Sequence, residues 1–250
     1  MSTSSKSNRS RRWIFFDTGP GSGAFNMEFD ASLFSRHRPG ETAPVFRLYG
    51  WSPPAVSLGR FQRRDEVVDA GGCAAAGVEV VRRITGGGAI LHGEELTYSL
   101  VCGDGDLGAR GVKESYRRIC GFLLRAYREL GLDPVYAVDA GPAVPAVGKA
   151  TPICFAGNEP FDIRVGGRKI GGNAQRRRRG VVFQHGSIPL RFDPELFSRC
   201  FRAPLPAANA AGLRELLPGL KPEDLKTAVV RAFAGHFGVD LVEPPPESRR

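Results

Sequence analysis

The spacing of hydrophobic positions divides the chain into short strands and a few long helices. Stretches rich in β-branched and aromatic residues, separated by Gly and Pro, predict strands. Apolar residues that recur every three to four positions predict helices. The predicted strands span 11–19, 44–51, 55–59, 78–84 and 96–102, and the predicted helices span 24–36, 112–131 and 221–238. Because strands occur in groups rather than in strict alternation with helices, we expect a single α+β domain with a mixed sheet flanked by helices.

Each predicted helix carries an apolar stripe that indicates its buried face. In the first, Phe25, Phe29 and Leu33 lie four residues apart. The last helix begins at Pro222 and ends at Gly238, residues that favour a helix start and a helix stop. The middle helix has the longest stripe, which consists of Val112, Tyr116, Ile119, Leu123, Tyr127 and Leu130. We expect all three helices to pack against the sheet through these faces.

A Gly-Gly pair at 166–167 predicts a two-residue hairpin, because both positions of such a turn need positive φ. This register pairs Arg164 with Lys169. It places Lys169 on the face shared by Asp162 and Arg164, away from the neighbouring apolar residues. Taken alone, a lysine at such a position is ordinarily exposed to solvent, so its chemistry has to be argued from other residues.

Composition restricts the class of protein. The 250 residues are 42% hydrophobic and contain no window of 18 uninterrupted apolar residues, so we expect no membrane span. Five cysteines are scattered without a C-x-x-C pair, which favours reduced thiols and the cytoplasm over a disulfide framework or a zinc site. We expect a disordered basic arm at 1–12, one catalytic domain at 13–240 and a flexible tail at 241–250.

The net charge of +9 is unevenly distributed. Residues 1–12 and the last two residues hold six cations and no acid, and the run at 176–179 adds four arginines. A local basic patch that faces an acidic partner explains this pattern at least as well as a nucleic-acid surface, and a solvated loop explains the run equally simply. No helix-turn-helix pattern is present, so a non-catalytic basic binding module is the remote alternative and nucleic acid is not an expected partner.

Two glycine-rich segments clear side chains from the backbone. The first, "VVRRITGGGAILHGEELTYSL" at 80–100, joins two arginines, three glycines and a histidine between strands. The second, "GGNA" at 171–174, follows the hairpin. A nucleotide-binding P-loop at 141–151 is excluded, because Ala143 and Ala150 stand where the motif requires Gly and Ser or Thr.

Three motifs in this order carry a family resemblance: "RRITGGGAILH" at 82–92, "GRKIGGNAQ" at 167–175 and "QHGSI" at 184–188. They resemble the lipoate–protein ligase and octanoyltransferase superfamily, which includes biotin–protein ligases. "GSGAFNMEFDASLF" and "AVSLGRFQ" support the match. The resemblance implies the biotin/lipoate ligase catalytic fold and transfer of an octanoyl or lipoyl group to a lysine of a lipoyl carrier domain, such as the glycine cleavage H protein or a 2-oxoacid dehydrogenase E2 subunit.

The resemblance also implies site residues. Lys169 is similar to the family's lysine that contacts the acyl carbonyl, and backbone N–H groups of the glycine-rich loop could stabilise an oxyanion. His92 and His185 could equally be structural. The implied substrate-binding set is Arg82, Arg83, Thr85, Gly86, Gly87, Gly88, Ala89, His92, Gly171, Gly172, Asn173, Ala174, His185 and Gly186.

The family activates its acyl group in two ways, and the chain has features of both. Cys154 in "ICFAGNEPFDI" lies where cysteine-type octanoyltransferases carry a nucleophile, which takes the acyl group from acyl carrier protein and needs no cofactor. Gly88 in "TGGGA" and the segment "GGNAQ" are closer to the ligases, which use ATP and Mg to form an acyl-adenylate, whereas Gly93 departs from the His-Asp pair common to both branches. Cys200 is the rival nucleophile, and Cys154 could be a packing residue. The lack of a second domain after 238 favours a transferase.

Overall fold

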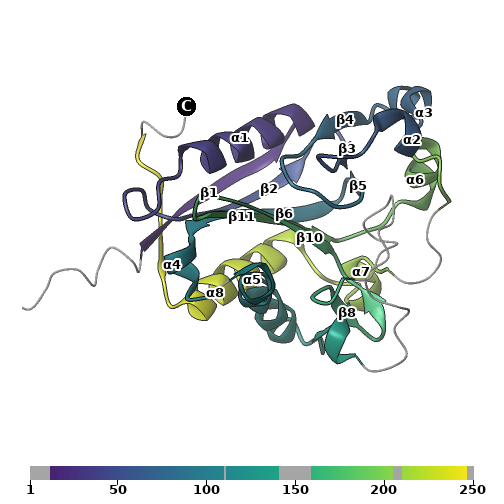
Figure 1. Ribbon diagram of the computed structural model, residues 1–250. Helices are drawn as coiled ribbons and strands as arrows, with labels where there is room; N and C mark the ends of the chain where they lie inside the picture. Colours follow the sequence, from purple (N-terminus) through teal and green to yellow (C-terminus); the bar gives the residue numbers. More distant parts are fainter. Residues whose placement is uncertain (1–11, 110, 141–158, 205–209, 247–250) are drawn as a thin grey trace, which may run out of the picture.

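The computed structural model describes residues 12–109, 111–140, 159–204 and 210–246. Its centre is a six-stranded mixed sheet in the order β10-β11-β6-β2-β1-β12, with parallel pairing among β2, β1 and β12 and antiparallel pairing elsewhere. These strands are β1 (Arg12–Gly21), β2 (Val45–Trp51), β6 (Glu95–Gly103), β10 (Gly172–Arg178), β11 (Val181–Pro189) and β12 (Asp240–Val242). One long helix, α1 (Gly23–Arg36), covers one face, and α5 (Gly111–Glu129) and α8 (Pro222–Phe237) cover the other (Figure 1).

Two small sheets flank this centre (Figure 1). One contains β3 (Ala55–Leu58), β4 (Glu79–Arg82) and β5 (Ile90–His92), and the other contains β7 (Val135–Tyr136), β8 (Ile163–Val165) and β9 (Arg168–Lys169). The remaining helices are α2 (Arg64–Val67), α3 (Ala70–Ala75), α4 (Asp104–Leu107), η2 (Ala137–Asp139), α6 (Pro194–Cys200) and α7 (Leu213–Leu216). No helix in the described ranges is long and apolar enough to cross a membrane.

The predicted strands and helices all occur, and the α+β class with a mixed sheet is confirmed. The sheet extends past both predicted ends of the domain. β1 begins at Arg12, and β12 pairs with it up to Val242, because the short chain segment after α8 returns alongside the first strand. Residues 1–11 and Cys154 lie outside the described part of the chain.

The main hydrophobic core lies between the large sheet and the helices α5 and α8. Phe233 of α8 is fully buried there and stacks on Phe46 of β2, with 3.8 Å between ring centroids. It also meets Trp13 and Phe122 edge-on, each at 5.2 Å. These aromatic contacts join the sheet to both helices and account for the stripe predicted in α8.

The prediction for α5 was nearly right. Ile119, Leu123 and Tyr127 are buried as expected. Val112 was wrong, because it is 59% exposed and the buried position of the first turn is Ser115. The hydroxyl of Ser115 donates to Gln175 on the sheet, so a polar contact replaces the expected apolar one at this end of the helix.

The buried face predicted for α1 was also wrong. Phe25 is 45% exposed, whereas Asn26 and Asp30 are almost completely buried. These two polar side chains are accepted in the interior because Arg47 of β2 binds both of them. Helix α1 therefore turns a polar stripe toward the sheet, and an apolar periodicity could not reveal it.

The Gly-Gly hairpin forms as predicted. Gly166 and Gly167 have φ values of 55° and 78°, and Arg164 pairs with Lys169 across the turn. The expected solvent exposure of a lone strand lysine does not hold. Lys169 is 1% exposed, and its Nζ lies 2.7 Å from Oδ2 of Asp162, the residue predicted to share its face.

We expect Phe233→Ala to lower the free energy of unfolding by about 3–5 kcal/mol, because it removes a ring that four other aromatic residues contact. Urea denaturation measures this change. Val138→Ala, at a residue that is 56% exposed, is the control and should cost less than about 0.5 kcal/mol. Equal effects of the two substitutions would contradict this account of the core.

Candidate active site

The candidate site lies on the face of the large sheet that α1 covers. Strand alternation sends successive side chains to opposite faces. In β6, Tyr98 and Leu100 enter the core with α5 and α8, whereas Thr97 and Ser99 point to the α1 side, where they bond Glu95 and Asp30. The same alternation gives the sheet one apolar face and one face that carries a row of buried polar groups.

A pocket opens between this polar face and the small sheet of β3, β4 and β5. Its cavity volume is about 10 Å³, roughly the space that one water molecule needs. Met27, Trp51, Ile90 and Ala174 supply apolar surface. The other lining residues are Tyr49, Ser57, Arg83, His92, Thr97, Gly172, His185, Gly186 and Ser187. Six residues of the predicted substrate-binding set thus line one pocket: Arg83, His92, Gly172, Ala174, His185 and Gly186.

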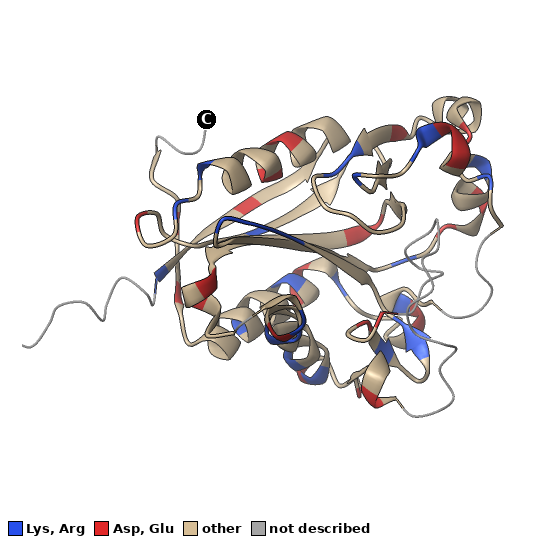
Figure 2. Ribbon diagram, viewed as in Figure 1, with Lys and Arg blue, Asp and Glu red and all other residues tan. Residues whose placement is uncertain are grey.

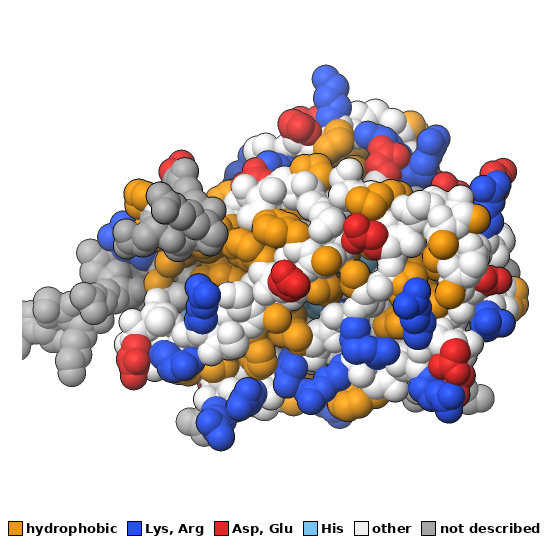
Figure 3. Space-filling view, turned by 90° about the horizontal axis from the view of Figure 1, so that it is seen from above, with side chains coloured by type: hydrophobic (Ala, Val, Ile, Leu, Met, Phe, Trp, Pro, Cys, Tyr) orange, Lys and Arg blue, Asp and Glu red, His pale blue; other side chains and the backbone are white. Residues whose placement is uncertain are grey.

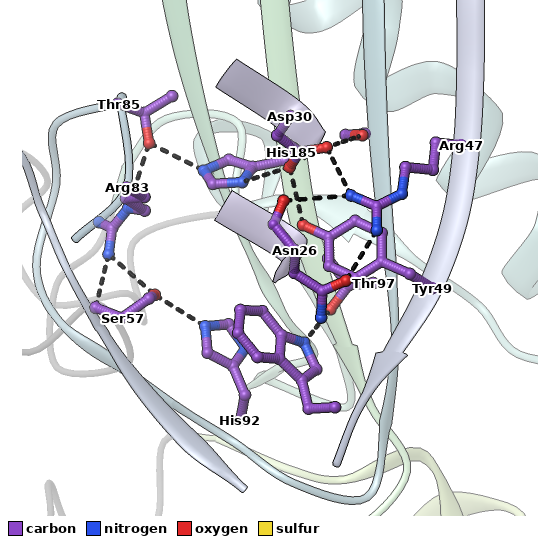
Figure 4. Close-up of polar contacts among 12 residues, drawn as sticks. Asn26, Asp30, Arg47, Tyr49, Ser57, Arg83, Thr85, His92, Thr97 and His185 are labelled. Carbon is purple, nitrogen blue, oxygen red and sulfur yellow. Dashed lines mark hydrogen bonds and ion pairs between the residues drawn. The ribbon is translucent and has the colours of Figure 1, made fainter. Parts of the chain in front are cut away.

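A buried ion pair lies beside the pocket (Figure 4). Arg47 Nη1 donates to Asp30 Oδ1 at 2.9 Å, and both side chains are almost completely buried. Tyr49 and Ser99 each donate a hydroxyl to the same carboxylate, at 2.9 and 2.7 Å. The negative charge is therefore well bonded in a dry environment, as a buried carboxylate requires.

His185 on β11 is held between this carboxylate and the glycine-rich loop (Figure 4). Its Nδ1 lies 3.8 Å from Asp30 Oδ2, and its Nε2 lies 2.8 Å from Thr85 Oγ1. Thr85 accepts a hydrogen bond from Arg83, so its own proton is available to Nε2. This arrangement favours the neutral tautomer with the proton on Nδ1, facing Asp30.

Burial and charge set the ionisation of this pair. Burial lowers the pKa of His185 below its usual value, although Asp30 opposes the shift, and the charge of Arg83 lowers it further. For Asp30, burial raises the pKa, but His185 and Arg47 outweigh it, so the pKa lies below its usual value. At neutral pH the pair therefore consists of a carboxylate and an uncharged imidazole.

Arg83 holds the glycine-rich loop in its shape. Its Nη2 donates to the carbonyl oxygens of Gly86 and Gly88, each at 2.7 Å. Its Nη1 donates to Ser57 on β3, at 2.8 Å to the carbonyl oxygen. Gly87 lies at the open apex of this loop with φ of 88°. The guanidinium is 2% exposed and shapes the loop from inside, and a direct contact of Arg83 with substrate stays a prediction.

His92 on β5 lies between a hydroxyl and a carboxylate, as His185 does. Its Nε2 lies 2.7 Å from Ser57 Oγ, and its Nδ1 lies 3.0 Å from Glu95 Oε1. Trp51 stacks on the ring, with centroids 3.8 Å apart and planes 10° apart. Because Arg83 also reaches Ser57 Oγ at 3.3 Å, one guanidinium contacts the hydroxyl partner of each histidine.

Arg82 points away from the pocket. Its Nη1 donates to the carbonyl oxygens of Gly59, Arg60 and Gln62, at 2.8, 3.2 and 2.8 Å. The loop at 59–62 is thereby fastened to the glycine-rich loop, and Arg60 N donates to Thr85 O at 2.8 Å. A side-chain carbon at Gly59 would collide with the carbonyl oxygen of Gly87, so the two loops touch through their backbones.

The "GGNA" segment forms the start of β10, at the pocket wall. Gly171 has φ of 104°, and a side chain there would collide with Ser187 O. Asn173 faces the other side of the sheet, where Tyr98 donates to its Oδ1 at 2.7 Å. Gly186 lies directly opposite Asn173, and a side chain at 186 would collide with Asn173 and Tyr98. Gly86, Gly88 and Ala89 complete the loop, with Ala89 buried in the core of the small sheet.

Lys169 is not among the residues that line the pocket, although it precedes Gly171 and Gly172 on the same segment. Its ion pair with Asp162 holds a cation in the interior next to that segment. A role for this cation toward an acyl carbonyl stays a prediction.

The four described cysteines are buried. Burial raises the pKa of Cys73 and of Cys102, and it raises the pKa of Cys200 to about 12. Cys120 is buried on the other face of the sheet and its pKa is raised as well. Cys200 packs in the hydrophobic core of the small sheet, where its burial and raised pKa disfavour the thiolate that a nucleophile needs.

Sequence reasoning missed several residues of the site. Asn26, Asp30, Arg47, Tyr49 and Glu95 were not in the predicted set. Two signals could have indicated them: a polar pair four residues apart in the first helix, and polar residues at alternate positions of strands that are otherwise apolar. Within the described ranges, no group of three or more His, Cys, Asp or Glu could hold a metal ion.

Comparison with known proteins agrees with this geometry. The sequence matches the lipoyl protein ligase A/B catalytic domain over residues 22–234. Octanoyltransferase LipM of Kyrpidia tusciae is 38% identical over 242 residues, which is 92% of this chain and 88% of that protein. A crystal structure of lipoate-protein ligase A bound with ATP superposes with a TM-score of 0.77 at 23% identity, over 94% of this chain and 88% of that one.

A bipartite lipoate protein ligase from Thermoplasma acidophilum, studied with its E2 lipoyl domain, superposes with a TM-score of 0.75 at 20% identity. The superposition covers 94% of this chain and 87% of that one. At such low identities the two structural matches show the fold, which is the ligase-like fold expected from the three motifs.

We expect the free energy of unfolding to fall as pH drops below about 6.5, the pKa of a histidine in an unfolded chain. Since burial lowers the pKa of His185 in the fold, the unfolded state binds more protons below this pH, and the loss ends at the lower folded pKa. One proton contributes at most about 1.4 kcal/mol per pH unit.

Chemical denaturation between about pH 5 and 7.5 tests this dependence. His37 and His236 also have lowered pKa values and persist in a His185→Gln variant, so they serve as the internal reference. The variant should show a shallower slope than the wild type. Parallel curves would mean that His185 is not held neutral by its surroundings.

Proposed function

Because the chain belongs to the lipoyl protein ligase A/B catalytic domain family, we propose that it transfers an octanoyl group to a specific lysine of a lipoyl carrier domain. The chain is an acyltransferase. The choice of octanoyl over lipoyl rests on the octanoyltransferase relative, and the acceptor class is that of the E2 lipoyl domain studied with the Thermoplasma acidophilum ligase. The glycine cleavage H protein is a further acceptor of the same kind.

The observation that carries this proposal is the pocket itself. Its apolar residues suit a saturated acyl chain, and its polar end brings the neutral His185 and the loop held by Arg83 together. Glycines at 86–88 let a thin ligand approach the backbone closely. We infer that the acyl chain enters the pocket as the apolar side chains that fill it move apart. Its carbonyl would then lie toward the N–H groups of the loop, which would stabilise the oxyanion formed during transfer.

We propose an acyl-cysteine intermediate at Cys154, formed from an acyl carrier protein thioester. The Cys154 thiolate attacks the thioester carbonyl, a new thioester bond forms and the carrier's thiol leaves with a proton. The amine of the acceptor lysine then attacks this thioester, an amide forms and the Cys154 thiol is released. Exchange between thioesters is nearly neutral in free energy and the amide is more stable, so no cofactor is needed.

Support for Cys154 comes partly from elimination. The other four cysteines are buried with raised pKa values, whereas Cys154 itself lies outside the described residues. We further propose that a single catalytic domain, 13–240 with the strand that follows, acts in the cytoplasm, since the sequence predicts reduced thiols.

The alternative is an ATP-dependent ligase that forms an acyl-adenylate with ATP and Mg. Two observations support this alternative: the chain shares its fold with lipoate-protein ligase A bound with ATP, and its loop "TGGGA" is similar to the loop of the ligases. In that case no enzyme nucleophile is required, and Cys154 would be a packing residue.

Intact-protein mass spectrometry separates the two. Wild type incubated with octanoyl-carrier thioester and no ATP should gain one octanoyl group, and addition of an apo lipoyl domain should remove it. Cys154→Ala should gain none, whereas the control Cys200→Ala should behave as the wild type because its thiol is buried. If no adduct forms, and free octanoate reaches the lipoyl domain only with ATP and equally well in Cys154→Ala, the protein is a ligase.

Substitutions in the ion pair of Lys169 with Asp162 separate a catalytic role of the lysine from a structural one. Lys169→Met should lower kcat by about 10²–10³, the effect of removing one oxyanion-stabilising group. It should also lower stability by about 3–5 kcal/mol, because the Asp162 charge is left buried without its partner. The double variant K169M/D162N removes both charges, so it should recover stability but not kcat. Recovery of kcat in the double variant would show that the lysine acts only as a structural partner.

A further inference from the structure

The four arginines at 176–179 do not act as one patch, because β10 sends them to opposite faces of the sheet. Arg177 points to the α5 side, where it pairs with Asp104 and donates to Ser115 Oγ at 2.8 Å. Arg176 points to the α1 side, where its guanidinium carbon lies 5.3 Å from the centre of the Phe34 ring. Arg179 is in the turn that ends the strand, with φ of 49°.

The α1-side arginines continue the wall of the pocket. Gly172 and Ala174 of β10 line the pocket, and Arg176 and Arg178 are the next two residues on that face of the same strand. At the usual rise of a strand they lie roughly 7 and 13 Å beyond Ala174. Arg176 Nη1 also donates to Ile84 O at 3.2 Å, so this strand and the segment leading into the glycine-rich loop are joined.

The loop at 59–62 adds to this surface from the other side. Arg60 and Phe61 are both exposed, and Phe61, at 83%, is the most exposed large hydrophobic residue of the described chain. The loop is not loose, since Arg82 binds three of its carbonyl oxygens. An aromatic side chain presented on a fixed loop is typical of an anchor in a protein interface.

The positive charge here is not balanced by acidic residues of the described ranges. In the described part of the structure, Arg60, Arg176 and Arg178 form no ion pair with an acidic residue, unlike Arg63 and Arg177 nearby. The charges that bear on Arg176 are those of Arg60 and Arg178, which are both cationic. The ribbon of β10 is blue toward its end in Figure 2, and Figure 3 shows several Lys and Arg side chains along the lower part of the face seen from above.

We propose that Arg60, Phe61, Arg176 and Arg178 form the docking surface for the acceptor, an acidic domain that presents its target lysine at the pocket. This proposal rests on the proposed function. A lysine reaches only as far as its four-carbon stem, so a domain that offers one has to sit directly at the pocket rim, where these residues are. A donor that carries its acyl group on a long arm has no such constraint. Unbalanced arginines around an exposed aromatic residue would steer and hold an acidic surface.

The experiment measures kcat and KM for an apo lipoyl domain, with octanoyl-carrier thioester as donor. The test variant is R60E/R178E, because both side chains are exposed. The matched control is K113E/K221E, which makes the same change in net charge at exposed residues of α5 and at the start of α8, the helices on the opposite face of the sheet. The test variant should raise KM for the lipoyl domain about tenfold or more, leave kcat within about twofold and weaken its salt dependence. The control should change KM by less than about twofold.

Phe61→Ser gives a second, uncharged test. It should raise KM for the lipoyl domain without changing the salt dependence, because it removes an apolar contact. Equal effects of the test and control pairs, or a rise in KM for the donor instead of the acceptor, would overturn the proposal. A wild type that does not modify the lipoyl domain at all would instead count against the proposed function, so the two failures are distinguishable.

Discussion

One guanidinium, that of Arg83, determines the shape of the candidate site. It binds two carbonyl oxygens of the glycine-rich loop, and it contacts the hydroxyls of Thr85 and Ser57, which are the partners of His185 and His92. A loop with three consecutive glycines has little conformational preference of its own. Its geometry therefore comes from a buried cation that donates hydrogen bonds to the carbonyl oxygens of the loop. The same cation fixes one hydroxyl partner of each imidazole, and Asp30 and Glu95 hold the other side of the two rings.

The large sheet separates two kinds of chemistry by strand alternation. On one face, aromatic rings from β1, β2, α5 and α8 pack into a dry core that supplies stability. On the other face, the ion pair of Asp30 with Arg47 lies within a network of hydroxyls. Buried charges contribute little net stability but strongly penalise other arrangements. In this acyltransferase, the polar face of the sheet thus positions the groups of the site, and the apolar face supplies the stability of the fold.

Much of the fold followed from local rules. Strand and helix periods located the elements, and the Gly166-Gly167 pair fixed a register that the structure reproduces. The family motifs also contained six residues of the predicted set that line the pocket. The face of α1 could not be predicted, because Asn26 and Asp30 are buried only through Arg47, which is 17 to 21 residues away in sequence. Lys169 and Arg83 bind partners that are close in sequence, such as Asp162 and Gly86, but a turn and a loop bring these groups together, and periodicity does not describe turns and loops.

The backbone contact between Gly59 and Gly87 limits which sequences this architecture can accept. A side chain at Gly59 would collide with the carbonyl oxygen of Gly87, whatever its polarity or charge. A loss of folding on substitution of Gly59 would therefore result from the close contact of two backbones, and it would not show that residue 59 recognises an acyl group. A redesign of the enzyme for bulkier acyl chains would have to preserve the contact between Gly59 and Gly87. It would enlarge the pocket instead at side chains that line it away from this contact, such as Met27 and Ile90.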